Sequence, residues 1–232
     1  MKTLRRIPIF LLSIALTLSS ITGCKKDDKI ETNVITDQDG NQYKTIVIGT
    51  QTWMAENLKT TKYRNGDPIE QVPDETAWSD LSTSAYCWYN NDGATYKATY
   101  GALYNWHAIS DARNICPTGW HIPTDDEWTI LIDYLGGLEI AGGKMKQTGT
   151  LNWTDPNTDA TNEGGFNAVP CSYRNIYGVF STGAFLKNAY WWSNSSINDI
   201  NSWYYGVSYN SGSSTRVAFA KNAAFSVRCI KD

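Results

Sequence analysis

The side chains that could carry chemistry in this chain are aromatic rings and amides. The sequence of 232 residues contains 10 Trp, 14 Tyr and 6 Phe. Two aromatic runs, Tyr190–Trp192 and Trp203–Tyr205, have Asn194, Asn198 and Asn201 beside them. An exposed ring stacks on a sugar ring while amides bind its hydroxyls, and Trp and Tyr are equally favoured in protein interfaces. The runs therefore predict a surface that binds glycan or a protein partner.

The expected ligand-binding residues belong to these runs or to the strands around them. They are Trp191, Trp192, Asn194, Trp203, Tyr204 and Arg174. Neighbouring side chains of a strand point to opposite faces, so the ring next to a core ring is either exposed or covered by a loop. Covered rings would make a Trp-rich core instead of a platform, and an arginine on a strand is often simply solvated. The sequence leaves these alternatives open.

No catalytic set is recognisable in the sequence. The two histidines, His107 and His121, lack the partner motifs of a nucleophilic triad. His121 stands between the apolar residues Trp120 and Ile122, which favours a structural, hydrogen-bonded histidine. The adjacent acids Asp125–Glu127 suit a helix start better than the separated carboxylates of a glycosidase. Without a CxxC motif or a Cys/His cluster, a zinc site is not expected. We predict a protein that is not an enzyme.

Composition excludes several classes of protein. The 20 Lys+Arg and 23 Asp+Glu give a formal net charge of −3, so a nucleic-acid partner, which requires a basic surface, is not expected. With 41% hydrophobic and 19% charged residues, the chain is not disordered and is long enough for one large domain or two small ones. Beyond residues 1–23, no apolar run approaches the roughly 18 residues that a membrane-spanning helix needs.

The N-terminus predicts export and lipidation. A short basic segment precedes an apolar stretch from Ile7 to Leu18, the pattern of a secretory signal that we place at residues 1–23. Ile21–Cys24 resembles a bacterial lipoprotein signal, with a small residue directly before the cysteine. The resemblance implies that Cys24 carries several acyl chains, enough for stable membrane anchoring. The alternative is ordinary cleavage that leaves Cys24 as a plain thiol.

Residues 24–33 are expected to form a hydrophilic tether. Lys25–Lys29 is a run of charges with nothing to bury, so it is solvated whatever its role. It also resembles the export tag of surface lipoproteins in Bacteroides-like bacteria. That resemblance implies a lipid anchor in the bacterial outer membrane, with the domain facing the cell exterior.

Four cysteines remain after Cys24, an even number that suits an exported and oxidised protein. They are Cys87, Cys116, Cys171 and Cys229. Four cysteines allow three pairings. Spacing alone does not choose between the three.

Residues 34–232 are expected to form one domain with a helical middle and a β-rich tail. Two β-branched runs, Tyr43–Ile48 and Gln51–Met54, predict a small β-meander. Residues 60–80 are polar and contain glycine and proline, so we expect a loop. Helical spacing of apolar residues predicts a short helix over Tyr100–Ser110.

The clearest expected element is a helix over Thr124–Leu135. Thr124 and Glu127 match the capping box, in which two side chains satisfy free N–H groups at the helix start. Apolar residues then recur at i, i+3, i+4 and i+7 from Trp128, which predicts one face against a core. Gly136–Gly137 ends the helix.

The rest of the chain is expected to be loop and short strands. Residues 136–165 are rich in Gly, Thr and Asn and are expected to form a long irregular surface region. The strands expected after it are Phe166–Tyr173, Tyr190–Ser193, Trp203–Tyr209, Thr215–Ala220 and Phe225–Ile230.

Several blocks of the sequence resemble a known family. They are Thr45–Lys59 (TIVIGTQTWMAENLK), Gly101–Trp106 (GALYNW), Ile115–Trp128 (ICPTGWHIPTDDEW) and Phe225–Asp232 (FSVRCIKD). In this order they resemble the Fibrobacter succinogenes major paralogous domain, over residues 34–232. Ile122–Trp128 and Phe225–Cys229 also resemble the formylglycine-generating-enzyme-like branch of the C-type lectin fold.

The resemblance implies a fold. The expected class is α+β, a C-type-lectin-like domain with two helices packed on short antiparallel strands and a long irregular loop region. It also implies a disulfide between Cys116, ahead of the helix, and Cys229, on the last strand. Cys87 and Cys171 would then pair or stay buried singly, and we favour pairing.

The same resemblance suggests two further possibilities, an oxidase activity and a calcium site. The oxidase branch binds copper through two cysteines shortly before the final strand, but Ser214–Ala224 contains none. Trp153–Asn157 and Trp192–Asn194 partly resemble the Ca²⁺-holding segments of sugar-binding C-type lectins, although Asp-Pro-Asn is also a favoured turn. We expect no cofactor, with calcium the possible exception. Glycan binding leads, a protein-binding adhesin is second, and a degenerate oxidoreductase is third.

Overall fold

The structure is a computed structural model that describes residues 34–232. The signal peptide at 1–23, the lipidation at Cys24 and the tether at 24–33 lie outside the described residues. The described part is mixed α+β, made mostly of sheets with few helices, which confirms the predicted class. None of the helices in residues 34–232 has the length and apolar character to span a membrane.

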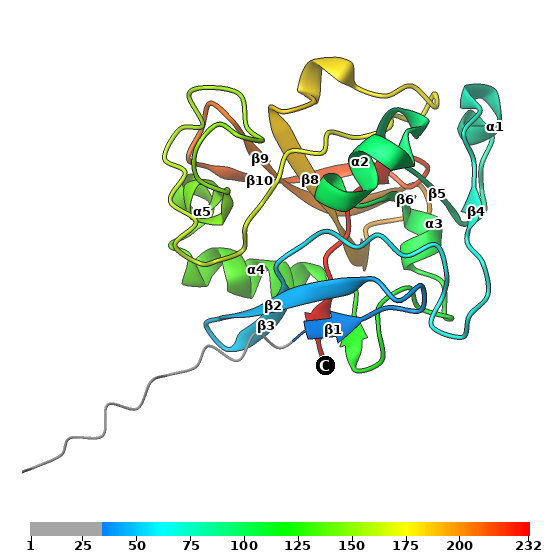
Figure 1. Cartoon of the computed structure of the whole chain (residues 1–232), viewed down its shortest axis with the longest axis horizontal. Coiled ribbons are helices and arrows are strands. Elements are labelled where there is room, and N and C mark those ends of the chain that lie inside the picture. The colour runs from blue at the N-terminus through cyan, green and yellow to red at the C-terminus, as the bar shows by residue number, and fades with distance from the viewer. Residues whose placement is uncertain (1–33) are drawn as a thin grey trace, which may run out of the picture. The chain divides into compact units, whose positions relative to one another are not determined.

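One sheet joins the first and last strands of the described chain. Its order is β1-β2-β3-β12-β7, and all neighbours are antiparallel. The strands are β1 Val34–Thr36, β2 Gln42–Ile48, β3 Gln51–Met54, β7 Trp120–His121 and β12 Ile230–Lys231. Ile230 pairs with both Trp53 and His121, so the chain end lies beside the first hairpin (Figure 1). The predicted β-meander is confirmed as β2 and β3.

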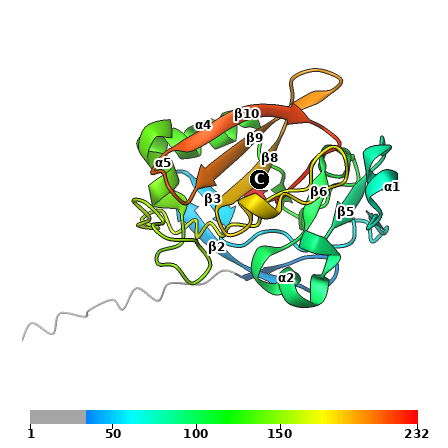
Figure 2. The ribbon, with the colours of Figure 1, turned by 90° about the horizontal axis from the view of Figure 1, so that it is seen from above.

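A second sheet contains the three longest strands of the C-terminal part. They are β8 Asn188–Ser196, β9 Asn201–Ser208 and β10 Ser214–Ala220, antiparallel in the order β10-β9-β8. These strands confirm three of the predicted ones; β8 and β10 are longer than predicted, and β9 begins earlier but ends at Ser208 instead of Tyr209. Figure 2 shows β10 along the outer edge and β8 toward the middle of the domain.

A third sheet has the order β11-β6-β5-β4, with β4 and β5 parallel. Its strands are β4 Glu70–Gln71, β5 Ala85–Cys87, β6 Leu103–Asn105 and β11 Ala224–Phe225. The helices are α1 Glu75–Ser79, α2 Gly93–Tyr100, α3 Trp106–Ile109, α4 Asp125–Tyr134 and α5 Leu138–Met145, with short 3-10 turns at Tyr89–Asn91 and Thr182–Ala184. At the start of α4, Thr124 and Glu127 form the predicted capping box.

Some elements differ from the expectation. Tyr100–Ser110 is not one helix, because Gly101 adopts φ 75° and ends α2 before β6 and α3 begin. Residues 34–232 contain the five α-helices named above, where two were expected. One of them, α5, lies within residues 136–165, which were expected to be irregular. Residues 60–80 contain β4 and α1, and no strand forms over Phe166–Tyr173.

The strand β8 lies between two parts of the core. Trp191 belongs to an apolar cluster with Trp128 of α4 and Tyr205 of β9. Trp192 belongs to a second cluster that includes Tyr104 and Phe225. At Trp191 and Trp192, β8 is therefore covered on both faces, on one by α4 and on the other by the third sheet.

The Cys116–Cys229 disulfide is present, as predicted, and joins positions 113 apart in the sequence. A loop of this length corresponds to about 4–5 kcal/mol of stability in the chain-entropy model. Cys87 and Cys171, which we expected to pair, are both free and buried. Burial raises the pKa of each thiol to about 12, so both stay protonated and apolar in character.

Candidate functional site

The outer part of the β8–β10 sheet holds a cleft, which we call the sheet cleft. The pairing places Tyr190 opposite Gly206 and Tyr204 opposite Val217. These positions share one face of the sheet because side chains alternate along each strand. The cleft has a volume of about 260 Å³. Its lining residues come from all three strands and from the β9–β10 turn.

Two half-buried tyrosines form the aromatic wall of the sheet cleft. Tyr190 and Tyr204 meet edge to face, with ring centroids 5.4 Å apart and planes at 89°. Tyr173 packs edge-on against Tyr190 at 5.4 Å, and the buried Phe225 lies 4.7 Å from Tyr204. Burial raises the pKa of Tyr190 and of Tyr204 above the usual value. Both hydroxyls therefore remain hydrogen-bond donors at neutral pH.

Gly206 lets the Tyr190 ring lie against the sheet. A Cβ at this position would be 2.8 Å from Cδ1 of Tyr190 and 3.2 Å from Oγ1 of Thr215. Any larger residue would therefore push the ring away from the strand. The glycine fixes the orientation of the aromatic wall.

The polar groups of the sheet cleft are an amide and hydroxyls. They come from Asn188, Ser208, Ser211, Ser213 and Thr215. Oγ of Ser208 donates to Oδ1 of Asn210 at 2.8 Å, while no charged side chain lines the cleft. The surface therefore combines aromatic rings with neutral hydrogen-bonding groups.

A buried lysine holds the β9–β10 turn beneath these hydroxyls. Nζ of Lys146 donates to the carbonyls of Thr158, Ser208 and Ser211 at 2.7–2.8 Å. Burial lowers the pKa of Lys146 to about 8, so at neutral pH the ammonium is charged and keeps its three donors. The lysine thereby ties the 147–165 loop to the turn.

The prediction that Trp191 and Trp192 bind ligand is wrong. Both rings are 0% exposed. The Trp191 indole N–H donates to Oδ1 of Asn57, and that of Trp192 donates to the carbonyl of Tyr104. The two side chains point to opposite faces of β8, as expected, but another layer covers the strand on each face at these two positions. Both residues belong to the core.

Arg174, predicted to bind ligand, is also fully buried. Its guanidinium donates to the carbonyls of Val72, Pro73 and Gly178. It also lies 4.4 Å from the Trp78 ring centroid. Arg174 therefore joins distant loops of the third sheet region and presents nothing to solvent.

Trp203 and Asn194 do not reach the sheet cleft. Trp203 is half-buried on the opposite face of β9, where the Arg216 guanidinium lies 3.6 Å from its ring centroid. Arg216 in turn makes two bonds to Asp125, at 2.6 and 2.7 Å. Asn194 is exposed, and its backbone N–H donates to Pro123. Of the six predicted ligand-binding residues, only Tyr204 lines the cleft.

In the first segment considered for calcium, hydrogen bonds to the backbone hold the side chain of Asn157. Nδ2 of Asn157 donates to the carbonyls of Gln147 and Gly149, and its side chain is buried while Asp155 is exposed. Within residues 34–232, no group of three or more His, Cys, Asp or Glu side chains is arranged to hold a metal ion. The Asp-Pro-Asn segment acts here as a turn.

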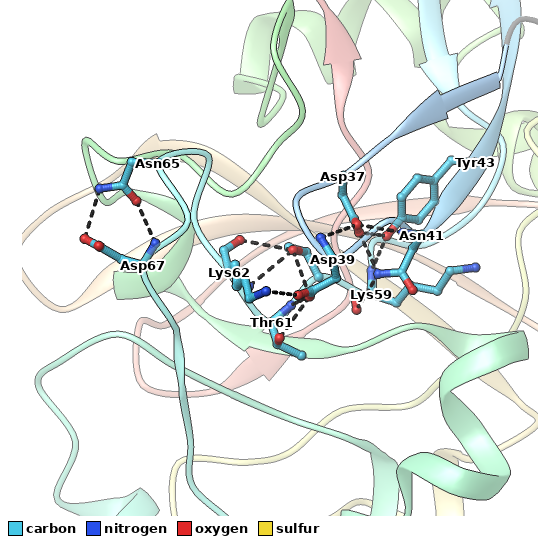
Figure 3. Close-up of polar contacts among 10 residues, drawn as sticks. Asp37, Asp39, Asn41, Tyr43, Lys59, Thr61, Lys62, Asn65 and Asp67 are labelled. Atoms are coloured by element: carbon cyan, nitrogen blue, oxygen red, sulfur yellow. Dashed lines mark hydrogen bonds and ion pairs between the residues drawn. The ribbon is translucent and has the colours of Figure 1, made fainter.

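The carboxylates of the acidic loop after β1 are likewise bonded to other residues of the protein. Asp37 accepts hydrogen bonds from the side chains of Asn41 and Tyr43, and Asp39 accepts from Thr61 and pairs with Lys62 at 3.3 Å (Figure 3). The Asp39 contacts fasten the β1–β2 turn to the segment after β3. Both carboxylates are structural.

Sequence reasoning missed Tyr190 and Asn188 as lining residues of the sheet cleft, and Tyr173 as the ring that packs against Tyr190. Tyr190 stood in a recognised aromatic run, but only the strand register shows that it shares a face with Tyr204. The serines of the β9–β10 turn carried no signal beyond their turn-forming composition. Register and turn geometry depend on long-range contacts.

Comparison with known proteins gives one match. The model of the Fibrobacter succinogenes major domain matches residues 46–231, which include the whole sheet cleft. No curated protein and no solved structure shows significant similarity to the chain.

Proposed function

We propose that this chain, which belongs to the Fibrobacter succinogenes major domain family, is a non-catalytic, ligand-binding domain of a surface lipoprotein. Its sheet cleft would bind a neutral glycan. The observation that carries this proposal is the juxtaposition of Tyr190 and Tyr204 with an amide and several hydroxyls, without a charged side chain.

The chemistry of the sheet cleft suits a sugar ring. The apolar face of a pyranose packs on an aromatic ring, and its hydroxyls exchange hydrogen bonds with neutral polar groups. Asn188 supplies both a donor and an acceptor, and serine hydroxyls rotate to suit either role. A ligand with a net charge would find no counter-ion within the lining.

The finer fold assignment is part of the proposal. A C-type-lectin-like arrangement is supported by the block Ile122–Trp128 at the start of α4, by the closing Phe225–Cys229 segment, and by the disulfide between Cys116 and Cys229. Fold alone does not fix function, so the argument for glycan rests on the cleft.

The proposed location rests on the N-terminal sequence. The lipoprotein-like Ile21–Cys24 and the charged Lys25–Lys29 support lipidation at Cys24 and export to the outer face of a bacterial outer membrane. Mass spectrometry of the membrane-extracted protein tests this. A diacylated or triacylated N-terminal Cys24 is expected, and an unmodified thiol there would contradict it.

Glycan-array binding followed by calorimetry tests the sheet cleft. Tyr190→Ala and Tyr204→Ala are each expected to weaken binding at least about tenfold, as for a ring at the centre of an interface. Tyr177→Ala removes an exposed ring that does not line the cleft and is the matched control. Unchanged affinity in both cleft variants, each shown to be folded, would exclude this site.

A protein-binding adhesin is the second candidate, and the free edge of β10 favours it. β10 is the outermost strand of its sheet, and Thr215–Ala218 are exposed. The Lys221 N–H donates to Ile200, so by alternation the Ala218 N–H points away from β9. An extended segment of another protein can add to such an edge.

Two substitutions at Ala218 distinguish the adhesin from the glycan-binding candidate. Ala218→Pro removes the outward N–H without removing a bond to β9, whereas Ala218→Thr keeps it. Partner capture that survives Ala218→Thr and is lost with Ala218→Pro would support the adhesin. Equal capture by both variants would exclude the edge.

A further inference from the structure

A second and larger cleft lies between β4, the segment before β5 and the end of α3. Figure 1 shows β4 and α3 at the right. Its volume is about 450 Å³. The side chains used below are Tyr63, Glu70, Ser82, Ser84, Asp111 and Arg113, all of which line it. We call it the acidic cleft. It shares no lining residue with the sheet cleft.

One guanidinium in this cleft is shared between two carboxylates. Arg113 bonds Asp111 at 2.7 Å and Asp67 at 3.2 Å. Asn65 holds Asp67 in place, donating from its side chain and accepting from the Asp67 backbone (Figure 3). The bonds from Arg113 lower the pKa of Asp111 to about 2, so that carboxylate is ionised at any physiological pH. The three groups together carry a net charge of −1.

The other ionisable groups leave the cleft acidic. Glu70 adds a carboxylate for which no ion pair is formed within residues 34–232. Burial, followed by the charge of Lys221, lowers the pKa of His107, so this imidazole is neutral at neutral pH. Lys221 itself is engaged elsewhere, because its ammonium donates to Asn198 and lies 4.1 Å from the Trp106 ring centroid.

A buried hydroxyl in the cleft, that of Tyr63, is poorly satisfied: it interacts with the side chains of Ser84 and Asp111 but makes no hydrogen bond of standard geometry with any described residue. Tyr63 is 1% exposed. The Arg113 guanidinium covers its ring at 3.9 Å from the centroid. Buried polar groups without partners are rare and destabilising. A bound molecule with a hydroxyl or amine would satisfy this one.

We propose that the acidic cleft binds a ligand that carries a primary ammonium group beside hydroxyls, such as an amino sugar. The ammonium would lie against the carboxylates of Glu70 and Asp111. The ligand's hydroxyls would bond the Tyr63 hydroxyl and the serines Ser82 and Ser84. An ammonium has three donors and no acceptor, which matches a lining in which carboxylate and hydroxyl acceptors predominate.

The test uses D-glucosamine and D-glucose as probes on the chain without the predicted signal at residues 1–23. At about pH 6 an amine with a pKa near 8 is protonated, so the two sugars differ in charge and little else. The protein is expected to bind glucosamine at least about tenfold more tightly than glucose. Thermal-shift and calorimetric titrations measure the two affinities. Glu70→Gln is expected to remove most of that difference.

Tyr63→Phe is the sharper variant, because a merely structural tyrosine predicts the opposite result. Removal of this poorly satisfied hydroxyl is expected to leave the ligand-free melting temperature unchanged or higher, while glucosamine binds at least about threefold more weakly. Tyr205→Phe, whose hydroxyl is satisfied by Asp125 at 2.9 Å, is the control. It is expected to lower the melting temperature and to leave glucosamine affinity unchanged.

Two results would overturn the proposal. One is equal affinity for glucosamine and glucose, including no binding of either. The other is full glucosamine affinity in both Glu70→Gln and Tyr63→Phe. Tyr190→Ala, in the sheet cleft, is expected to keep glucosamine binding, so failure here and failure of the proposed glycan function are told apart.

Discussion

The sheet cleft and the acidic cleft differ in what supports them and in their charge. The sheet cleft rests on three paired strands, and its polar groups are neutral. The acidic cleft is built mainly from loops, with Asp67, Asp111 and Arg113 fixed by ion pairs. Hydrogen bonds between paired strands fix the geometry of the sheet cleft, whereas ion pairs fix that of the acidic cleft. The difference predicts two recognition modes in one domain: stacking on rings without charge at the sheet cleft and ammonium binding at the acidic cleft.

The largest expected effect separates the rings that support the sheet cleft from those that line it. Trp192→Ala is expected to cost about 3–5 kcal/mol of unfolding free energy, because it removes a fully buried indole from a packed core. Tyr190→Ala on the same strand should cost about 1–2 kcal/mol, since its ring is half solvated. Denaturant unfolding measures both. Equal costs would mean that the two rings have the same surroundings.

The next effect tests whether the sheet cleft depends on its buried cation. Lys146→Met is expected to cost about 2–4 kcal/mol, because the carbonyls of Thr158, Ser208 and Ser211 lose their donor. Glycan binding should fall with it, while glucosamine binding at the acidic cleft remains. Lys144→Met, which removes only an ion pair with the exposed Glu163, should cost less than about 1 kcal/mol. Loss of both binding activities would show that the clefts are coupled.

Salt should distinguish the two clefts without any substitution. Raising the salt concentration from about 0.05 to about 0.5 M shortens the screening length several-fold. Glucosamine affinity at the acidic cleft is expected to fall about threefold or more, whereas glycan affinity at the sheet cleft should change less than about twofold. Calorimetric titrations at the two salt concentrations measure this. A salt-independent acidic cleft would contradict its electrostatic basis.

The smallest effect concerns a histidine outside both clefts. His121 bonds Asp232 at 2.7 Å and Glu127 at 2.8 Å. Burial opposes protonation, but these two carboxylates outweigh it and raise the pKa of His121. Its contribution to stability is therefore complete below the unfolded pKa, about 6.5, and is lost as pH rises through the folded value.

His121→Gln measures that contribution. The wild type is expected to be more stable than the variant at about pH 5, by less than about 1 kcal/mol for a partly exposed pair. The difference should shrink toward about pH 8. Neither cleft contains His121, so both affinities should be unchanged. A difference that grows with pH would mean that the histidine is neutral in the folded protein.

The sequence predicted the parts of the fold that depend on local signals. The capping box at Thr124, the apolar stripe of α4 and the first hairpin all form as expected. The Cys116–Cys229 disulfide, implied by the family resemblance, is present as well. The short elements around Gly101 were not predicted, because one residue with a positive φ divides a stretch that has helical spacing.

The candidate site was predicted only in part, for a physical reason. Strand alternation correctly places Trp191 and Trp192 on opposite faces, but nothing local shows that layers from distant segments cover both. Arg174 likewise looks like a surface residue until Val72 and Pro73 supply its carbonyl partners. The tyrosine pair is recognisable only once the register of β8 and β9 is known.

The most direct test of the account is an amide NMR titration of the folded domain with the glycan that the array selects. Binding at the sheet cleft is expected to shift the amide signals of Gly206, Ser208, Ser211 and Thr215 and to leave those of Glu70 and Asp111 unchanged. Shifts confined to the acidic cleft, or no shifts at saturating glycan, would contradict the claim that the tyrosine-lined face of the sheet is the glycan-binding surface.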